Sequence, residues 1–287
     1  MLAAGHTVNM PGIYDALTAR LAEQAGFAVG FISGYAVSAA RLAAPDLGYV
    51  TQTEMADAAR EVCRATTMPV IVDADTGYGN ALSAIRTARG LAAAGASGLF
   101  LEDQAWPKKC GHFAGKRVVA AHEWLTKLRA IVDLRAEGLD LFVVARTDAR
   151  AAVSLDEAVA RAQAAIEIGV DAIFVEAPQS IDELVAIAEA TPGAMRVANM
   201  VEGGRTPLLT PAELHDLGYD LIVTPLTALL GATRAIREAF AILAREGTMR
   251  AHRELLVDFA EFGAVVDLPA HQALEHRYTT EPEERPV

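Results

Sequence analysis

The sequence has little cysteine, no long apolar run and no signal-peptide pattern at its start. Its two cysteines, Cys63 and Cys110, lie too far apart for the paired spacing of a zinc or redox motif. A disulfide between them is not expected in a reducing compartment. No uninterrupted apolar segment is long enough to cross a bilayer, and the first residues lack a charged region followed by an apolar one. We therefore expect a cytoplasmic protein that does not bind membranes.

Basic residues are fewer than acidic residues. The chain has 25 Lys and Arg against 37 Asp and Glu, a formal charge of −12, and no basic stripe with interleaved aromatic residues. This composition argues against nucleic acid as a partner. No GxGxxG or Walker motif is present, which removes the usual nucleotide-binding signals. What remains is an aliphatic chain, 52% hydrophobic and 6% aromatic, that can bury a large core.

Short apolar runs alternate with Ala-rich amphipathic stretches along the chain. This order predicts an α/β protein, a (β/α)₈ barrel, because eight strands in roughly 250 residues is the count of that fold. The expected strands are Thr7–Met10, Ala28–Ile32, Val70–Asp73, Leu99–Glu102, Leu141–Arg146, Ala172–Glu176, Arg196–Asn199 and Leu221–Thr224. Expected helices include Ile13–Gln24, Thr53–Thr66, Ala81–Ala94, His122–Ala136, Leu155–Ile168 and Ile181–Ala190. We expect a single barrel domain over 1–287, with a helical C-terminal extension over 229–287.

Polar and charged residues follow most of the expected strands. Active sites of (β/α)₈ barrels lie at the carboxyl ends of the strands, so these positions predict the site. In chain order they are Ser33, Gly34 and Tyr35, then Asp73 and Asp75, Glu102 and Asp103, Arg146 and Asp148, Glu176, and finally Asn199 with Glu202.

Three of these carboxylates suggest a metal site. Asp73 and Asp75 are two residues apart, so on an extended strand end they would point to the same side, and Glu102 ends the next strand. Oxygen ligands suit Mg²⁺, and carboxylates buried together need a cation or protons. Alternatively, the two aspartates cap the following helix, with Gly77 and Gly79 making the turn. Weaker candidates for the same cation are Asp46 and His112.

The segment Lys108–His112, with sequence Lys-Lys-Cys-Gly-His, holds a thiol among cations. Neighbouring cations and His112 could favour the thiolate of Cys110. The segment follows a barrel strand, and Gly111 and Gly115 could act as hinges, so we predict a lid that carries a proton donor over the pocket. The alternative is a solvated basic loop with a small buried cysteine.

Arg146 can form a bidentate fork with a substrate carboxylate. Its alternative is an internal ion pair with Glu176 or Asp148. Several neutral groups could hold carboxylate oxygens: Ser33, Gly34, Asn199, Thr206 and Thr224.

With these motifs in place, the sequence resembles the isocitrate lyase/phosphoenolpyruvate mutase superfamily. The resemblance rests first on Leu101–His112 with its Lys-Lys-Cys-Gly-His core. Further matching stretches are Pro11–Ala16, Ser33–Tyr35, Pro45–Gly48, Asp73–Gly79, Ala145–Ala149, Val175–Ala177 and Asn199–Pro207. The branch it looks most like contains the petal death protein, 2,3-dimethylmalate lyase, 2-methylisocitrate lyase and carboxyphosphonoenolpyruvate phosphonomutase.

The resemblance implies an assembly and a ligand set. The last helix is expected to swap with a neighbour, giving a homotetramer built as a dimer of dimers. Mg²⁺, with Mn²⁺ as a substitute, is expected near Asp73, Asp75 and Glu102, largely through water. The implied substrate-binding residues are Ser33, Gly34, Tyr35, Asp73, Lys109, Gly111, His112, Arg146, Asn199 and Thr206.

The resemblance and the residues together predict a Mg²⁺-dependent carbon–carbon lyase. Its substrate would be a small 2-hydroxy or hydrated 2-oxo dicarboxylate, such as a 2-alkylmalate, 2-methylisocitrate or oxaloacetate. The products would be a 2-oxo acid such as pyruvate and a second carboxylic acid. Cys110 would act as the general acid, Arg146 and His112 would assist, and the base would be Tyr35, Glu176 or a metal-bound water. The alternatives are a phosphonomutase that forms a P–C bond and a catalytically idle ligand-binding barrel.

Overall fold

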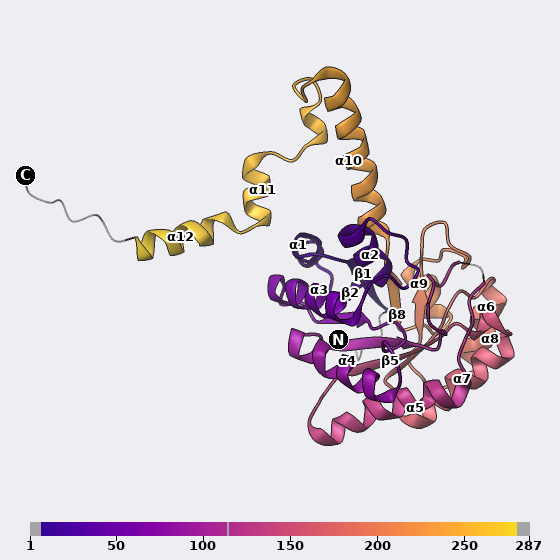
Figure 1. Ribbon diagram of the computed structural model, residues 1–287. Coiled ribbons are helices and arrows are strands. Elements are labelled where there is room, and N and C mark those ends of the chain that lie inside the picture. The colour runs from indigo at the N-terminus through magenta and orange to yellow at the C-terminus, as the bar shows by residue number, and fades with distance from the viewer. Residues whose placement is uncertain (1–6, 114, 280–287) are drawn as a thin grey trace, which may run out of the picture. The chain divides into compact units, whose positions relative to one another are not determined.

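The structure is a computed structural model that describes residues 7–113 and 115–279 (Figure 1). The chain divides into two compact units, Met1–Leu230 and Gly231–Val287. No helix among the described residues is long and apolar enough to cross a membrane.

All eight expected strands are present in the first unit, each within a few residues of its expected bounds. They are β1 (Val8–Ile13), β2 (Gly30–Ile32), β3 (Val70–Asp73), β4 (Gly98–Glu102), β5 (Phe142–Thr147), β6 (Ala172–Val175), β7 (Val197–Asn199) and β8 (Leu221–Thr224). The strands pair in parallel in the order β6-β5-β4-β3-β2-β1-β8-β7. An isolated parallel bridge between Ile173 and Arg196 joins the two ends, so the sheet closes. The (β/α)₈ barrel is confirmed.

Helices connect the strands, and three of them, α4, α7 and α8, have the bounds expected from the sequence. The helices of the first unit are α1 (Ala16–Gln24), α2 (Gly34–Leu42), α3 (Gln52–Ala65), α4 (Ala81–Ala94), α5 (Ala121–Val132), the 3-10 helix η2 (Asp133–Glu137), α6 (Ala149–Ala152), α7 (Leu155–Ile168), α8 (Ile181–Ala190) and α9 (Pro211–Asp216). Helix α2 was not expected. Ser33 caps it by accepting a hydrogen bond from the Ala36 amide, so the chain turns into a helix immediately after β2.

Three phenylalanine side chains pack together inside the barrel. Phe100 lies between Phe31 and Phe174, with ring centroids 4.8 and 5.7 Å away. These rings are almost fully buried together with Met10 and Val144 from neighbouring strands. Rings at such spacing add about 0.5–1.5 kcal/mol per pair beyond their buried area. Phe31 and Phe174 also form part of the floor of the cavity described below.

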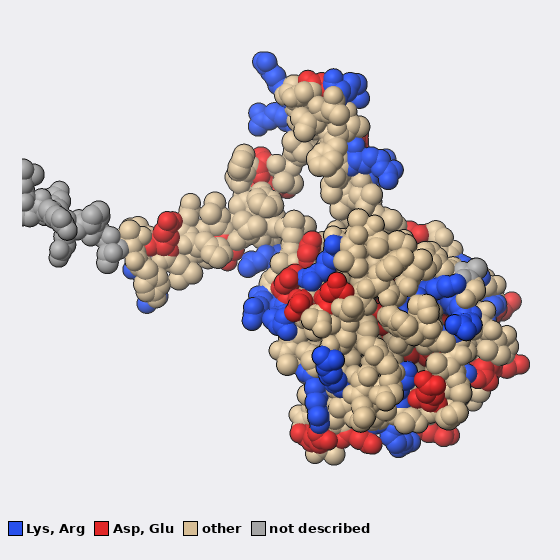
Figure 2. Space-filling view, viewed as in Figure 1, with Lys and Arg blue, Asp and Glu red and all other residues tan. Residues whose placement is uncertain are grey.

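The second unit contains most of α10 (Thr227–Glu246), followed by η3 (Arg253–Leu255), α11 (Phe259–Val265) and α12 (Leu268–Tyr278). Large apolar side chains of this unit are exposed, and Phe259 is 97% exposed. On the face of the first unit shown in Figure 2, Lys and Arg are interspersed with Asp and Glu.

Candidate active site

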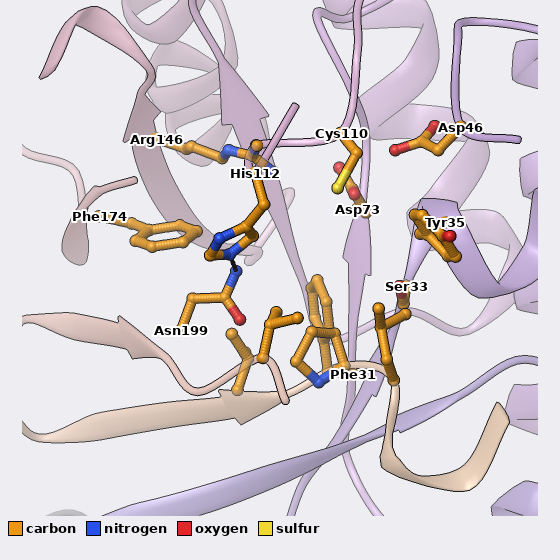
Figure 3. A pocket seen from close by; sticks show the side chains of 15 residues that line it. Phe31, Ser33, Tyr35, Asp46, Asp73, Cys110, His112, Arg146, Phe174 and Asn199 are labelled. Carbon is orange, nitrogen blue, oxygen red and sulfur yellow. Dashed lines mark hydrogen bonds between the residues drawn. The ribbon is translucent and has the colours of Figure 1, made fainter. Parts of the chain in front are cut away.

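A cavity lies at the carboxyl ends of the barrel strands, where the sequence places the functional residues. It encloses about 40 Å³ and is shown in Figure 3. Its polar lining residues are Ser33, Tyr35, Asp46, Asp73, Cys110, Gly111, His112, Arg146 and Asn199. Its apolar lining residues are Phe31, Phe174, Val201, Val223, Pro225 and Leu226. The structure therefore brings residues from six strands or strand ends and the cysteine loop around one space.

The thiol of Cys110 points into this cavity (Figure 3). Its backbone amide donates to the Asp46 carbonyl at 3.1 Å, which holds the loop against the segment that follows α2. Burial raises the pKa of the Cys110 thiol to about 12; the His112 amide opposes this effect, and the Asp46 carboxylate adds to it. The expectation that the nearby cations favour a thiolate at Cys110 is therefore wrong. The thiol keeps its proton at neutral pH, because desolvation outweighs the nearby cations.

His112 ties the cysteine loop to two other parts of the barrel. Its Nδ1 accepts from the Arg205 amide at 3.1 Å, so the ring proton is on Nε2, which lies 3.1 Å from Glu176 Oε1. Asn199 Nδ2 donates to the same Glu176 oxygen at 3.3 Å. Burial alone raises the pKa of Glu176, but Arg146 and His112 outweigh it and the net pKa is lowered. Glu176 is therefore an ionised carboxylate directly behind the loop.

Gly111 is required as a glycine for a steric reason. A Cβ added there would lie 2.5 Å from Glu176 Cδ, so only a residue without a side chain lets the loop approach this carboxylate. The role of Gly111 as a hinge stays a prediction.

Arg146 is surrounded by carboxylates beneath the cavity. Its Nε lies 3.0 Å from Asp148 Oδ2, 3.3 Å from Glu102 Oε2 and 3.8 Å from Glu176 Oε2. Its Nη2 donates to Asp148 Oδ1 at 3.3 Å, so the bidentate fork goes to Asp148. The internal ion pair that the sequence left open is thus present, and Arg146 still lines the cavity.

Lys108 lies inside the site, among carboxylates. Its Nζ is 2.6 Å from Asp46 Oδ1 and 2.6 Å from Asp75 Oδ1, and Lys108 is 3% exposed. The sequence predicted only a flanking cation there. Burial raises the pKa of Asp75 to about 7, against the opposing effect of Lys108 and with the help of Asp73 and Asp46.

Asp75 does not have the extended geometry expected of it. Strand β3 ends at Asp73, and Asp75 has φ 47°, in the left-handed region. Its amide donates to Asp73 Oδ1 at 3.1 Å, so the two carboxylates meet through a turn. The expectation that they share one side of a strand was wrong, because the strand stops first.

The carboxylates suit a hard cation. Glu102 Oε1 is buried and has no hydrogen-bond partner among the described residues. Burial raises the pKa of Glu102 well above its usual value, although Arg146 opposes the rise. An oxygen-only donor set with an unpartnered buried carboxylate oxygen fits Mg²⁺. Within residues 7–113 and 115–279, however, three His, Cys, Asp or Glu side chains do not converge as direct ligands.

The remaining expected residues fall into two groups. Ser33 and Tyr35 line the cavity, and burial raises the pKa of the Tyr35 phenol, with Cys110 and Asp46 adding to it. Gly34 sits against the carboxylates, since a Cβ there would be 3.0 Å from Asp73 Oδ2. Thr206 and Lys109 do not line the cavity. Lys109 Nζ donates to the Gly115 carbonyl at 3.3 Å.

Asp103, adjacent to Glu102, supports the barrel from outside. Its carboxylate accepts from Thr147 Oγ1 at 2.6 Å, the Asp148 amide at 2.8 Å and Arg161 Nη1 at 3.1 Å. Removing one partner of such a buried pair costs about 3–5 kcal/mol. Asp103 therefore fixes the end of β5, which carries Arg146, without touching the cavity.

The fold and the cavity together define an α/β barrel whose functional side chains gather at the strand ends. Residues 1–244 match the family described as phosphoenolpyruvate phosphomutase. The chain is 51% identical over 276 residues to the carboxyvinyl-carboxyphosphonate phosphorylmutase of Arabidopsis thaliana, covering 95% of this chain and 81% of the relative. It is 45% identical over 273 residues to the petal death protein of Dianthus caryophyllus, covering 95% and 85%.

Solved structures give the same result. A crystal structure of 2,3-dimethylmalate lyase aligns with a TM-score of 0.91 at 32% identity, covering 100% of this chain and 95% of the other. Phosphonopyruvate hydrolase in complex with oxalate and Mg²⁺ aligns with a TM-score of 0.85 at 31% identity, covering 96% of each chain. The chain belongs to the PEP mutase/isocitrate lyase superfamily.

Proposed function

We propose that this protein is a Mg²⁺-dependent lyase that cleaves a carbon–carbon bond in a small 2-hydroxy or hydrated 2-oxo dicarboxylate. The observation that carries the proposal is the position of the Cys110 thiol, which points into a cavity also lined by Arg146 and Asp73. Burial raises the pKa of this thiol, which favours its protonated form. Cleavage leaves a carbanion next to a carboxylate, and a buried thiol can protonate it. The petal death protein and 2,3-dimethylmalate lyase relatives support the same class of reaction.

Four residues of the cavity, and Glu176 behind the loop, have roles in the proposed cleavage. Cys110 donates its proton to the departing carbanion, and Arg146 orients a substrate carboxylate. His112 holds the loop against Glu176, because both of its ring nitrogens are already engaged. Glu176, an ionised carboxylate that lies behind the loop and does not line the cavity, takes the proton of the 2-hydroxyl through one intervening water. Tyr35 keeps its own proton because its pKa is raised, so it serves as a hydrogen-bond donor.

Asp73, Asp75 and Glu102 would hold the Mg²⁺, mainly through water. When bound, the ion would stabilise negative charge on the oxygen of the 2-oxo acid product. A structure of the phosphonopyruvate hydrolase relative includes oxalate and Mg²⁺, which supports this assignment. The neutral groups Ser33 and Asn199 would hold the remaining carboxylate oxygens.

The apolar wall of the cavity favours an alkyl-substituted substrate. Val201, Val223, Pro225 and Leu226 line it together with two phenylalanine rings. Burying one methylene group against such a wall contributes about 0.8 kcal/mol. We therefore place a 2-alkylmalate ahead of 2-methylisocitrate, whose third carboxylate would need a further charged partner.

A phosphonomutase that forms a P–C bond is the second candidate, favoured by the 51% identity to the Arabidopsis phosphorylmutase. A substrate panel separates the two functions. We expect pyruvate or glyoxylate to form from at least one 2-hydroxydicarboxylate, and only with Mg²⁺ present. Phosphorus NMR of the same enzyme with a carboxyphosphonate substrate reports P–C bond formation. A P–C product without dicarboxylate cleavage would replace the lyase proposal, and no product in either assay would favour a ligand-binding barrel.

We also propose a homotetramer of helix-swapped dimers. Its support is the exposure of large apolar side chains in the second unit, among them Phe240 at 66% and Phe259 at 97%. Surfaces of this kind are usually covered by a partner. Light scattering of the full chain should give four times the mass of one chain. A monomer at micromolar concentration would contradict the assembly.

A further inference from the structure

Lys116 is a buried cation that the proposed reaction does not use. It is 7% exposed and lies at the end of the cysteine loop, six residues after Cys110. The segment before this loop pairs with the segment after it. Gln104 bridges to Val118, and the Ala105 amide donates to the Arg117 carbonyl at 2.8 Å, so the base of the loop is fixed.

The ammonium group of Lys116 connects the loop to the arginine of the site. Its Nζ donates to the Gly111 carbonyl and, at 2.6 Å, to Asp148 Oδ1. Asp148 in turn accepts from Arg146 Nε at 3.0 Å. The carbonyl that Lys116 holds belongs to the residue between Cys110 and His112. One unbroken chain of contacts thus runs from the peptide next to the thiol to the guanidinium that lines the cavity.

This chain of contacts is buried. Asp148 is 0% exposed, and the side chain of Lys116 is 1% exposed. Burial alone raises the pKa of Asp148, but Arg146 and Lys116 outweigh it and lower the pKa to about 2. Asp148 is therefore charged throughout the neutral range and holds both cations at once. Hydrogen bonds between ionised buried groups are directional and strong, so they fix the positions of both partners.

We infer that Lys116 is a positioning residue, which acts with Asp148 to set the Cys110 thiol against Arg146. The inference rests on the proposed function, because its purpose is to place the proton donor relative to the carboxylate that Arg146 orients. Without Lys116 the Gly111 carbonyl loses its charged donor, and the segment next to Cys110 loses one of the contacts that hold it in place. Arg146 keeps Asp148 as a partner, so substrate binding should suffer less than the proton transfer.

The test uses Lys116→Met, which keeps the apolar stem and removes the donor. The matched control is Arg117→Met, which removes an exposed cation from the adjacent position. Iodoacetamide labelling followed by mass spectrometry gives the alkylation rates of the Cys110 and Cys63 peptides separately. We expect Lys116→Met to speed alkylation of Cys110 by about tenfold, the effect of losing one charge-assisted hydrogen bond. The rate at Cys63, which lies on α3, should not change.

In the same variant kcat should fall while KM changes little, whereas Arg117→Met should match the parent in every readout. An unchanged Cys110 rate in folded Lys116→Met would overturn the inference. So would equal acceleration at both cysteines, because that means general loosening. If Lys116→Met does not fold, Lys116→Gln is judged by the same criteria. The alkylation result does not depend on turnover, so a parent without lyase activity refutes the proposed function and leaves this test standing.

Discussion

Cys110→Ser is expected to abolish turnover and to leave the binding of a 2-oxo acid close to that of the parent. Serine has nearly the same shape as cysteine, but its hydroxyl is a much weaker acid than a thiol. General acid catalysis contributes about 10²–10⁴-fold, so kcat should fall by that factor. Binding should persist because Arg146, Ser33 and Asn199 line the cavity independently of the thiol. Single-turnover formation of pyruvate measures the first effect, and calorimetric titration with pyruvate measures the second.

Cys63→Ser is the matched control. Cys63 is the other cysteine of the chain and is absent from the cavity lining among the described residues. Burial raises its pKa to about 11, so it is also a protonated thiol, in a different place. The control should keep the kcat of the parent. Turnover by Cys110→Ser at the rate of the parent would remove the general acid from the mechanism.

The strands were predictable because strands of a parallel barrel are buried on both faces. Such strands appear in the sequence as short, nearly continuous apolar runs, as in Val70–Asp73 and Leu221–Thr224. Helix α4 was predictable for a different reason. Asn80 caps its start, and Gly95, with φ 101°, ends it in the left-handed region. Local signals of this kind specify element bounds without knowledge of the tertiary contacts.

Side-chain directions in the loop after β4 were not predictable. Lys108 and Lys109 are adjacent and chemically identical, yet Lys108 is buried between two aspartates and Lys109 contacts the Gly115 carbonyl. The loop has no regular period, so sequence spacing does not assign a face to either residue. The contact between Asp46 and Lys108 was not predictable for the same reason, because it depends on the path of this loop.

The opposite directions of Glu102 and Asp103 follow from the alternation of side chains along a strand. Successive residues of a strand point to opposite faces, so Glu102 and Asp103 cannot both face the barrel interior. The structure places Glu102 Oε2 3.3 Å from Arg146 Nε and Asp103 Oδ2 3.1 Å from Arg161 on the helical side. The alternation of side-chain direction therefore assigns Glu102 to the site and Asp103 to the supporting structure around it.

Asp75→Ala should abolish Mg²⁺-dependent activity and weaken Mg²⁺ binding by at least about 100-fold, since even residues that only orient metal ligands contribute 10–100-fold. Asp75 is 1% exposed and shares the cluster with Asp73 and Glu102, so its loss removes one of the three carboxyl groups that would hold the cation. In the parent, a chelator should remove activity and added Mg²⁺ should restore it. Calorimetric titration with Mg²⁺ measures binding without turnover. If a chelator does not change the activity of the parent enzyme, the magnesium assignment is contradicted.

The substitution also removes an ion-pair partner of Lys108, so the two effects must be separated. Lys108→Met breaks the same 2.6 Å contact and leaves every oxygen of Asp75 in place. Without the ammonium, Asp75 Oδ1 loses the cation that would compete with Mg²⁺ for it. Lys108→Met should therefore bind Mg²⁺ at least as tightly as the parent, even if its turnover falls. Equal loss of Mg²⁺ binding in both variants would mean that the ion pair holds the site together, and that Asp75 acts on the metal only through Lys108.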